Sequence, residues 1–214
     1  LLRRCPPPER RLGLLFSATL SHRVQELAYE HMNNPVHVDV EPEKVTAERV
    51  RQILYHTANE EKIPLLVGIL KHVDPHRSII FVNTKRNADR VARDLTGEGT
   101  KAEAIHGDLR QQIRERVLAD FASGRLPVLV ATNVAARGLD IVGITHVVNF
   151  DVPDDPKDYV HRVGRTARGD QTGDAVTLMS PHEVMMVREI EKLTGSPIPR
   201  QVVPGFEPTF SPDL

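Results

Sequence analysis

The strongest constraint on the fold is an alternation of short apolar runs with helical patterns, which begins near Val50. Ile79-Ile80-Phe81-Val82 and Val128-Leu129-Val130 are unbroken apolar runs, as expected of strands that are buried on both faces. Between such runs, apolar residues recur at helical spacing. Strands that alternate regularly with helices predict an α/β fold, in which a parallel sheet has helices on both faces.

The same pattern predicts the position of each element. We expect strands at residues 53–56, 78–82, 102–105, 127–131, 145–150 and 174–179, and helices at residues 60–72, 87–95, 111–122, 156–163 and 182–193. In such sheets, ligands bind at the carboxyl ends of the strands, in the loops that lead into helices. Polar clusters stand in three of these loops: Asn83-Thr84-Lys85, His106-Gly107-Asp108 and Thr132-Asn133.

The chain divides into four parts by composition. Residues 1–38 combine a short apolar run, a helical pattern and a strand-like Val36-His37-Val38, and they are too few to bury a core alone. Residues 39–49 are polar and charged, as in a linker. We therefore expect the main domain at residues 50–197 and a proline-rich C-terminal extension at residues 198–214.

Composition narrows the possible classes of function. The net charge is −1 and aromatic residues make up 4% of the chain, so any nucleic-acid site is local and contacts the backbone rather than stacked bases. The single Cys5 excludes an internal disulfide and a cysteine-cluster metal site, and no metal ligands are expected. No apolar run approaches the length of a membrane helix and no signal-peptide pattern opens the chain. We expect a cytoplasmic protein that does not bind membranes.

Arg162, Arg165 and Arg168 recur at a spacing of three within residues 161–169. The planar guanidinium group can donate two parallel hydrogen bonds to a phosphate, and this spacing places such groups on one face of a helical turn. Small residues between the arginines would let a polyanion approach. Taken alone, the triplet is better explained as a solvated basic helix end that pairs with nearby carboxylates.

Further polar clusters have the composition of phosphate contacts. Thr132 stands at a strand end before small residues, where a hydroxyl and backbone amides can bind phosphate, and Asp140 could accept hydrogen bonds from a ribose. Gln111 and Arg114 share one face of the next helix and could hold a phosphodiester. Each cluster also has a plainer explanation as a helix cap, a turn or a solvated face, as does Ser17-Ala18-Thr19.

In this order, the clusters resemble the later motifs of the DEAD-box RNA helicases. Ser17-Ala18-Thr19 is similar to motif III, and the similarity extends to motif IV (residues 80–85), the Gln-x-x-Arg motif (111–114), motif V (131–140) and motif VI (161–168). The resemblance covers residues 12–198 and is greatest to the RhlB-type helicases of the bacterial RNA degradosome. Two departures are Asn133, where an acidic residue is common, and Ala167, where glycine is common.

The resemblance implies a RecA-like second domain, preceded by a remnant of a first domain, and a nucleotide site shared between the two. It implies that Arg165 and Arg168 act as arginine fingers on ATP, with His161 as a third catalytic residue. Asp140 would hold the ribose and Gly138 would keep the backbone close to it; with Arg165 and Arg168 they form the expected cofactor-binding set. Mg²⁺ would be held mainly by the first domain.

The resemblance also implies an RNA-binding set and a coupling set. The expected RNA contacts go to phosphates and 2′-hydroxyls and are made by Thr84, Gly107, Gln111, Arg114 and Thr132. The expected interdomain coupling residues are Ser17, Thr19 and Arg162, with His161 contributing. For Arg162 a scaffolding role inside the domain is the alternative.

Two motifs that the family needs for ATP hydrolysis do not occur in this sequence. Neither a Gly-Lys-Ser/Thr phosphate loop nor an Asp-Glu-Ala-Asp box is present, so we expect no ATPase activity from the chain by itself. The expected partners are RNA and the chain's own first RecA-like domain. Two alternatives remain at this point: a docking module for a degradosome scaffold of the RNase E type, and a DNA-directed helicase of the same superfamily.

Overall fold

The computed structural model describes residues 5–16, 22–38, 50–73, 77–136, 141, 143–167, 172–203 and 206. The chain divides into two compact units, Leu1–Lys44 and Val45–Leu214. The expected linker at residues 39–49 lies outside the described residues, as do several predicted site residues, namely Ser17, Thr19, Gly138, Asp140 and Arg168.

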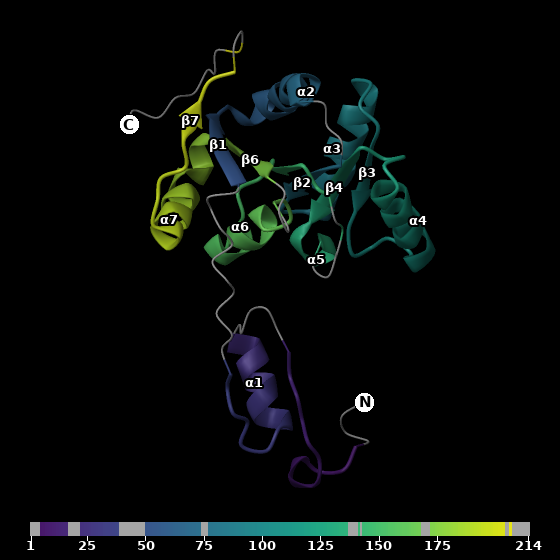
Figure 1. Ribbon diagram of the computed structural model, residues 1–214, viewed down its shortest axis with the longest axis vertical. Helices are drawn as coiled ribbons and strands as arrows, with labels where there is room; N and C mark the ends of the chain where they lie inside the picture. The colour runs from purple at the N-terminus through teal and green to yellow at the C-terminus, as the bar shows by residue number, and fades with distance from the viewer. Residues whose placement is uncertain are drawn as a thin grey trace. The chain divides into compact units, whose positions relative to one another are not determined.

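The second unit is built on a parallel sheet, which has seven strands in the described part of the chain (Figure 1). The strands are β1 (Val50–His56), β2 (Ser78–Val82), β3 (Ala102–Ile105), β4 (Val128–Thr132), β5 (His146–Asn149), β6 (Gly173–Met179) and β7 (Arg200–Gln201). Their order across the sheet is β3-β4-β2-β5-β6-β1-β7, and every neighbouring pair is parallel. This arrangement confirms the predicted α/β fold with a parallel sheet.

Helices cover both faces of the sheet. One face carries α2 (Lys62–Val73) and α3 (Lys85–Gly97), and the other carries α4 (Gln111–Ala122), α5 (Asn133–Ala136), α6 (Pro156–Val163) and α7 (Val184–Thr194). Short 3-10 turns, η4 (Asn59–Glu61) and η5 (Pro181–Glu183), precede α2 and α7. The expected elements of this domain are therefore all present, with ends that shift by a few residues.

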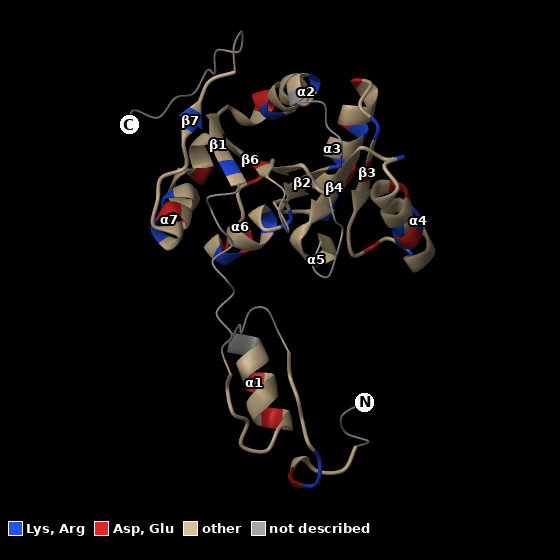
Figure 2. Ribbon diagram, in the orientation of Figure 1, with Lys and Arg blue, Asp and Glu red and all other residues tan. Residues whose placement is uncertain are grey.

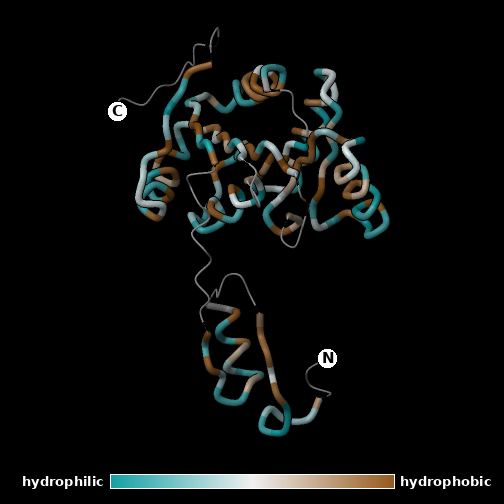
Figure 3. Tube along the Cα trace, in the orientation of Figure 1, coloured by the Kyte–Doolittle hydropathy of each residue, from teal (hydrophilic) through white to brown (hydrophobic). Residues whose placement is uncertain are grey.

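Strand β2 shows why the sheet is buried on both sides. Its alternate residues Ile80 and Val82 pack with the α2 and α3 side, whereas Ile79 and Phe81 pack with the α4 and α5 side. Successive side chains of a strand point to opposite faces, so an unbroken apolar run supplies both layers of core. Figure 3 shows this as apolar strands in the centre and more hydrophilic outer turns on the helices.

Local signals define where the helices begin and end. The Thr84 hydroxyl accepts a hydrogen bond from the Asn87 amide (3.2 Å) and caps α3. Asp155 caps α6 through the Lys157 amide (2.9 Å), and Pro156 occupies the first turn. Helix α7 ends at Gly195, whose φ of 73° is a left-handed conformation that suits glycine.

The register brings the carboxyl ends of the inner strands to one edge of the sheet, called here the carboxyl edge. Val82 at the end of β2 pairs with Thr132 at the end of β4, and Phe81 pairs with Asn149 at the end of β5. Ile105 at the end of β3 pairs with Ala131. The loops that follow β2, β3, β4 and β5 therefore open along this edge, which is where the sequence placed the ligand-binding clusters.

The start of the expected C-terminal extension belongs to the sheet. Residues Arg200–Gln201 form β7 beside β1, the Leu54 amide donates to the Pro199 carbonyl oxygen (2.8 Å), and Ile198 is buried. Val203 and Phe206 pack against the core on the α2 side. The sequence also missed α5, because four residues are too few to show a helical period.

The first unit contains η2 (Pro8–Arg10) and α1 (His22–His31). The helical pattern expected there is confirmed, but the strand expected at Val36-His37-Val38 is wrong, since these residues form no regular element. None of the unit's described residues is buried, and Leu12, Phe16 and Val36 are more than four-fifths exposed. No described helix in either unit is long and apolar enough to span a membrane.

Candidate functional site

Arg162 is the central side chain of the carboxyl edge. It projects from α6 and is 2% exposed, and its guanidinium group reaches loops from three strands. Nε donates to Asn133 Oδ1 (2.7 Å) after β4, Nη2 donates to Asn83 Oδ1 (2.9 Å) after β2, and Nη1 donates to Asn149 Oδ1 (3.2 Å) at the end of β5. A fourth bond runs from Nη1 to the Asp151 carbonyl oxygen (2.7 Å). One planar group thus fastens three strand ends to one helix.

The surroundings of Arg162 stabilise its buried positive charge. Its guanidinium carbon lies 5.1 Å from the centre of the Phe81 ring, a cation–π distance. Burial lowers its pKa to about 10, and the nearby carboxylates of Asp158, Asp151 and Asp154 oppose that shift. The group therefore stays protonated at neutral pH. All of its hydrogen bonds named above lie within the second unit, which favours the scaffolding role; the coupling role remains a prediction.

The Asn133 amide binds two side chains of α6. Its Oδ1 accepts from Arg162 Nε, and its Nδ2 donates to Asp158 Oδ2 (2.8 Å). The amide therefore connects the buried arginine to a carboxylate one turn earlier on the same helix. Because an amide offers both a donor and an acceptor, it satisfies both neighbours at once.

The Asp151 carboxylate joins the same framework. Its Oδ2 accepts from the Asn83 amide (2.9 Å) and from Asn87 Nδ2 (2.7 Å), so the loop after β5 is tied to the start of α3. The buried Lys62 donates to the Phe150 carbonyl oxygen (2.8 Å) and pairs with Glu183 (2.7 Å). The polar groups of Asn83, Asp151 and Lys62 are thus satisfied by neighbours from other loops, which restricts the loops after β2 and β5.

The nucleotide-side candidates lie at the end of α6. His161 and Arg165 are both half-buried, and Arg165 follows the helix cap at Gly164. The next residue, Thr166, is 1% exposed and donates to the Ile144 carbonyl oxygen (2.6 Å). Its hydroxyl also fills the space beside Gly173 at the start of β6, where a Cβ would lie 1.9 Å from Oγ1. The close packing of Thr166 against Gly173 therefore holds the segment that carries the arginines against the sheet.

The RNA-side candidates gather on the loops after β2, β3 and β4. Thr84 and Gly107 are exposed, whereas Thr132 is buried at 7% exposure. Arg114 donates to the Ala135 carbonyl oxygen (2.9 Å), which ties the first turn of α4 to α5, and Gln111 donates to Glu115 (2.7 Å). The structure places all five predicted residues along the carboxyl edge. Thr84 also caps α3, a function that the sequence analysis did not predict for it.

Several residues of this framework were missed by sequence reasoning. Asn149 and Asp158 bind Arg162 or its amide partner, yet a lone Asn in a strand and an Asp in a helix give no local signal. Lys85 and Asp108 form an exposed ion pair across two loops that the sequence had marked as polar clusters. Their position in the sequence next to Thr84 and Gly107 was the signal that could have identified them as site residues.

Charge on the surface is mixed rather than segregated. Figure 2 shows basic and acidic residues together on α4 and again on α7. This agrees with the net charge of −1 and with a polyanion site confined to a few loops. Among the described residues no cluster of three His, Cys, Asp or Glu side chains could hold a metal ion, so no Mg²⁺ ligand is assigned to them.

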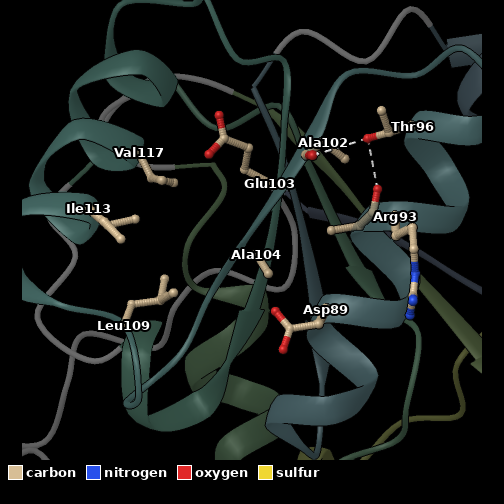
Figure 4. Close-up of a pocket in the computed structure, with 10 residues that line it drawn as sticks. Asp89, Arg93, Thr96, Ala102, Glu103, Ala104, Leu109, Ile113 and Val117 are labelled. Carbon is tan, nitrogen blue, oxygen red and sulfur yellow. Dashed lines mark hydrogen bonds between the residues drawn. The ribbon is translucent and has the colours of Figure 1, made fainter.

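A groove of about 340 Å³ runs beside the edge strand β3, between α3 and α4 (Figure 4). Its floor is formed by the small side chains of Ala102 and Ala104, and Ile113 and Val117 line the α4 side. Thr96 donates to the Ala102 carbonyl oxygen (3.2 Å). The groove belongs to the flank of the domain, and none of the Arg162 partners lines it.

Comparison with known proteins identifies the domain. Residues 61–170 match the helicase conserved C-terminal domain. The chain is 47% identical over 199 residues to the ATP-dependent RNA helicase RhlB of Pectobacterium carotovorum subsp. carotovorum (strain PC1), covering 93% of this chain and 46% of that protein. It is 46% identical to the RhlB of Vibrio cholerae serotype O1, covering 93% and 45%. The chain spans about half the length of the curated relatives it matches.

Solved structures agree with this comparison. E. coli SrmB, a DEAD-box protein bound to regulator of ribonuclease activity A, superposes with a TM-score of 0.73 at 34% identity, over 76% of this chain and 96% of that one. S. cerevisiae Dbp5, bound to RNA and ADP BeF3, gives a TM-score of 0.76 at 32% identity, over 87% and 50%.

The chain belongs to the family of helicase C-terminal domains. Within it, the predicted DEAD-box type and RecA-like fold are confirmed, and the similarity is to the RhlB-type helicases in particular.

The close packing of Thr166 against Gly173 can be tested by substitution. We expect Gly173→Ala to lower the free energy of unfolding by about 1 to 3 kcal/mol, because the added methyl group overlaps a buried side chain. Gly68→Ala is the matched control. It lies in α2 with no atom within 4 Å of the new Cβ, and we expect it to raise stability by about 0.5 to 1 kcal/mol. Denaturant unfolding measures the free energy of unfolding of both variants, and equal effects would contradict the close packing at Gly173.

Proposed function

We propose that this chain is the second half of an ATP-dependent RNA helicase and provides one wall of both the nucleotide site and the RNA cleft. The observation that carries the proposal is the Arg162 framework. It ties the loops after β2 and β4, which carry Thr84 and Thr132, to the helix with the nucleotide-side candidates. A clamp that couples ATP to RNA needs such a rigid connection between its two half-sites.

On the nucleotide side, Arg165 and Arg168 would stabilise the negative charge that develops on the γ-phosphoryl group. Arginine fingers of this kind contribute about 10³ to 10⁵ in rate. Gly138 would allow close approach of the backbone, and Asp140 would accept hydrogen bonds from the ribose. His161, Ser17 and Thr19 would couple the nucleotide site to the clamp across the domain boundary.

On the RNA side, Thr84, Gly107 and Gln111 would contact phosphates and 2′-hydroxyls along the carboxyl edge. Contacts of this type bind the backbone and give little base specificity. The structure supports a modified role for two members of the set. Thr132 is buried and Arg114 is hydrogen-bonded to the α5 backbone, so both would shape the loop while presenting amides or a guanidinium edge to phosphate.

The catalytic remainder would come from the first domain. The phosphate loop and the acidic box that hold ATP and Mg²⁺ do not occur in this sequence, so we propose that the chain by itself does not hydrolyse ATP. In the joined protein, closure of the two domains on RNA would bend one strand and separate a short duplex. We further propose a cytoplasmic site of action, as expected for an RhlB-type helicase.

The arginine fingers are tested in a protein that joins this chain to a first RecA-like domain. We expect Arg168→Ala, and separately Arg165→Ala, to reduce RNA-stimulated ATP turnover by about 10³-fold or more. Arg168→Lys should recover little, because an ammonium group cannot replace the bidentate fork. The control is Arg125→Ala, an exposed arginine that pairs with Asp120 before β4. Unchanged turnover in Arg168→Ala would remove the assignment.

A second candidate function is protein docking, and the groove beside β3 favours it. An edge strand can accept an extended segment as an additional strand. We propose that the occupant is an extended apolar segment of a degradosome scaffold of the RNase E type. The matched SrmB chain, almost all of which aligns with this domain, is bound to a protein regulator of ribonuclease activity.

Calorimetry of this chain against a scaffold peptide tests the docking function. We expect binding heat with the parent chain, and its loss in Ile113→Asp, because Ile113 is 41% exposed in the groove and can be changed without disturbing the core. Met185→Asp on α7 introduces the same charge at another exposed apolar site and should bind normally. Absence of heat at high micromolar concentration would reject the function, and normal binding by Ile113→Asp would reject the groove.

A further inference from the structure

An ion pair bridges the two loops of the proposed RNA face. Lys85 Nζ donates to Asp108 Oδ1, which connects the first residue of α3 to the loop after β3. Both side chains are exposed, at 53% for Lys85 and 66% for Asp108. The Lys85 stem passes Gly107, since a Cβ at that glycine would lie 3.9 Å from Lys85 Cε. The pair therefore spans the space between Thr84 and Gly107.

The surroundings of Lys85 favour a carboxylate beside it. A helix N-terminus disfavours a cation, and the first turn of α3 contains no acidic residue. Asp89, one turn later, is engaged by the buried His106, whose Nε2 lies 3.0 Å from Asp89 Oδ1. Asp108 thus supplies the compensating charge, and its hydrogen bond with Lys85 holds the pKa of Asp108 below its usual range.

The pair is also easy to open. Exposed ion pairs contribute little to stability, because water screens the charges and two flexible side chains must be held in one geometry. A phosphate that approached Thr84 and Gly107 would offer Lys85 an equivalent anion. Exchanging one anion for the other costs the lysine little, and it leaves Asp108 free in solvent.

We propose that Lys85 is a phosphate-binding residue of the RNA face and that Asp108 is an internal counter-ion which RNA displaces. The inference rests on the proposed function, because it assumes that RNA binds along the carboxyl edge. It assigns Asp108 a tuning role: the carboxylate competes with RNA for Lys85 and so limits the affinity. Because Asp108 acts only through Lys85, the effect of changing Asp108 should depend on whether Lys85 is present.

The experiment measures the affinity of the joined two-domain protein for a fluorescent single-stranded RNA, with a non-hydrolysable ATP analogue, at several salt concentrations. We expect Asp108→Asn to tighten binding roughly two- to fivefold, the equivalent of one exposed ion pair. Lys85→Gln should weaken binding and reduce the slope of log affinity against log salt by about 0.7, as for the loss of one phosphate contact to a single strand. In the Lys85→Gln background, Asp108→Asn should have no effect.

Asp120→Asn is the matched control, because Asp120 pairs with Arg125 (2.7 Å) and its removal changes the net charge by the same amount. Equal tightening by Asp120→Asn would mean that only overall charge matters, and would overturn the inference. Tightening by Asp108→Asn that persists without Lys85, or weaker binding by Asp108→Asn, would overturn it as well. If the parent protein binds no RNA, the proposed function fails first.

Discussion

The structure depends on one buried charge. Arg162 is held by hydrogen bonds to three asparagine side chains and one carbonyl oxygen, and its charge is balanced by carboxylates that surround it without touching it. A buried guanidinium group is costly unless its donors are satisfied. Meeting that requirement forces the ends of β2, β4 and β5 into one arrangement with α6.

This arrangement places two kinds of chemistry on one rigid edge. The loops after β2, β3 and β4 face the proposed RNA path. Helix α6 continues into the segment that carries the arginines, which Thr166 holds against the sheet. Arg162 joins the ends of β2, β4 and β5 to α6, so one buried hydrogen-bonded framework connects the two sides. Asn133 preserves the framework with an amide, since Asp158 provides the carboxylate from the helix itself.

The sequence predicted the elements that depend on local chemistry. Strand β2 and helices α4 and α6 were placed at their observed limits because an apolar run or a helical period is visible within a short stretch of the sequence. Elements that depend on distant partners were not predictable in this way. β7 exists because it pairs with β1, although its flanking prolines suggested an extension, whereas Val36-His37-Val38 has strand-forming residues but forms no strand.

The sequence predicted which residues belong to the candidate site but not which of them are hydrogen-bonded to one another. The sequence placed the polar clusters at residues 83–85, 106–108 and 132–133 at the carboxyl edge, since parallel strands bring their ends together, but it located Arg162 and Arg165 only on a helical segment. No spacing rule could pair Arg162 with Asn149, because that contact arises from the packing of α6 across the sheet. The same is true of the bond from Arg114 to Ala135, which joins two motifs through the tertiary fold.

The central claim is that Arg162 is a buried connector held by four hydrogen bonds, and nuclear magnetic resonance of its Nε–H group tests this most directly. The account predicts that this proton exchanges with water much more slowly than the Nε proton of an exposed arginine such as Arg116, and that it shows a scalar coupling to the Asn133 side-chain carbonyl across the hydrogen bond. Exchange as fast as that of the exposed arginines, with no coupling to Asn133, would contradict the account.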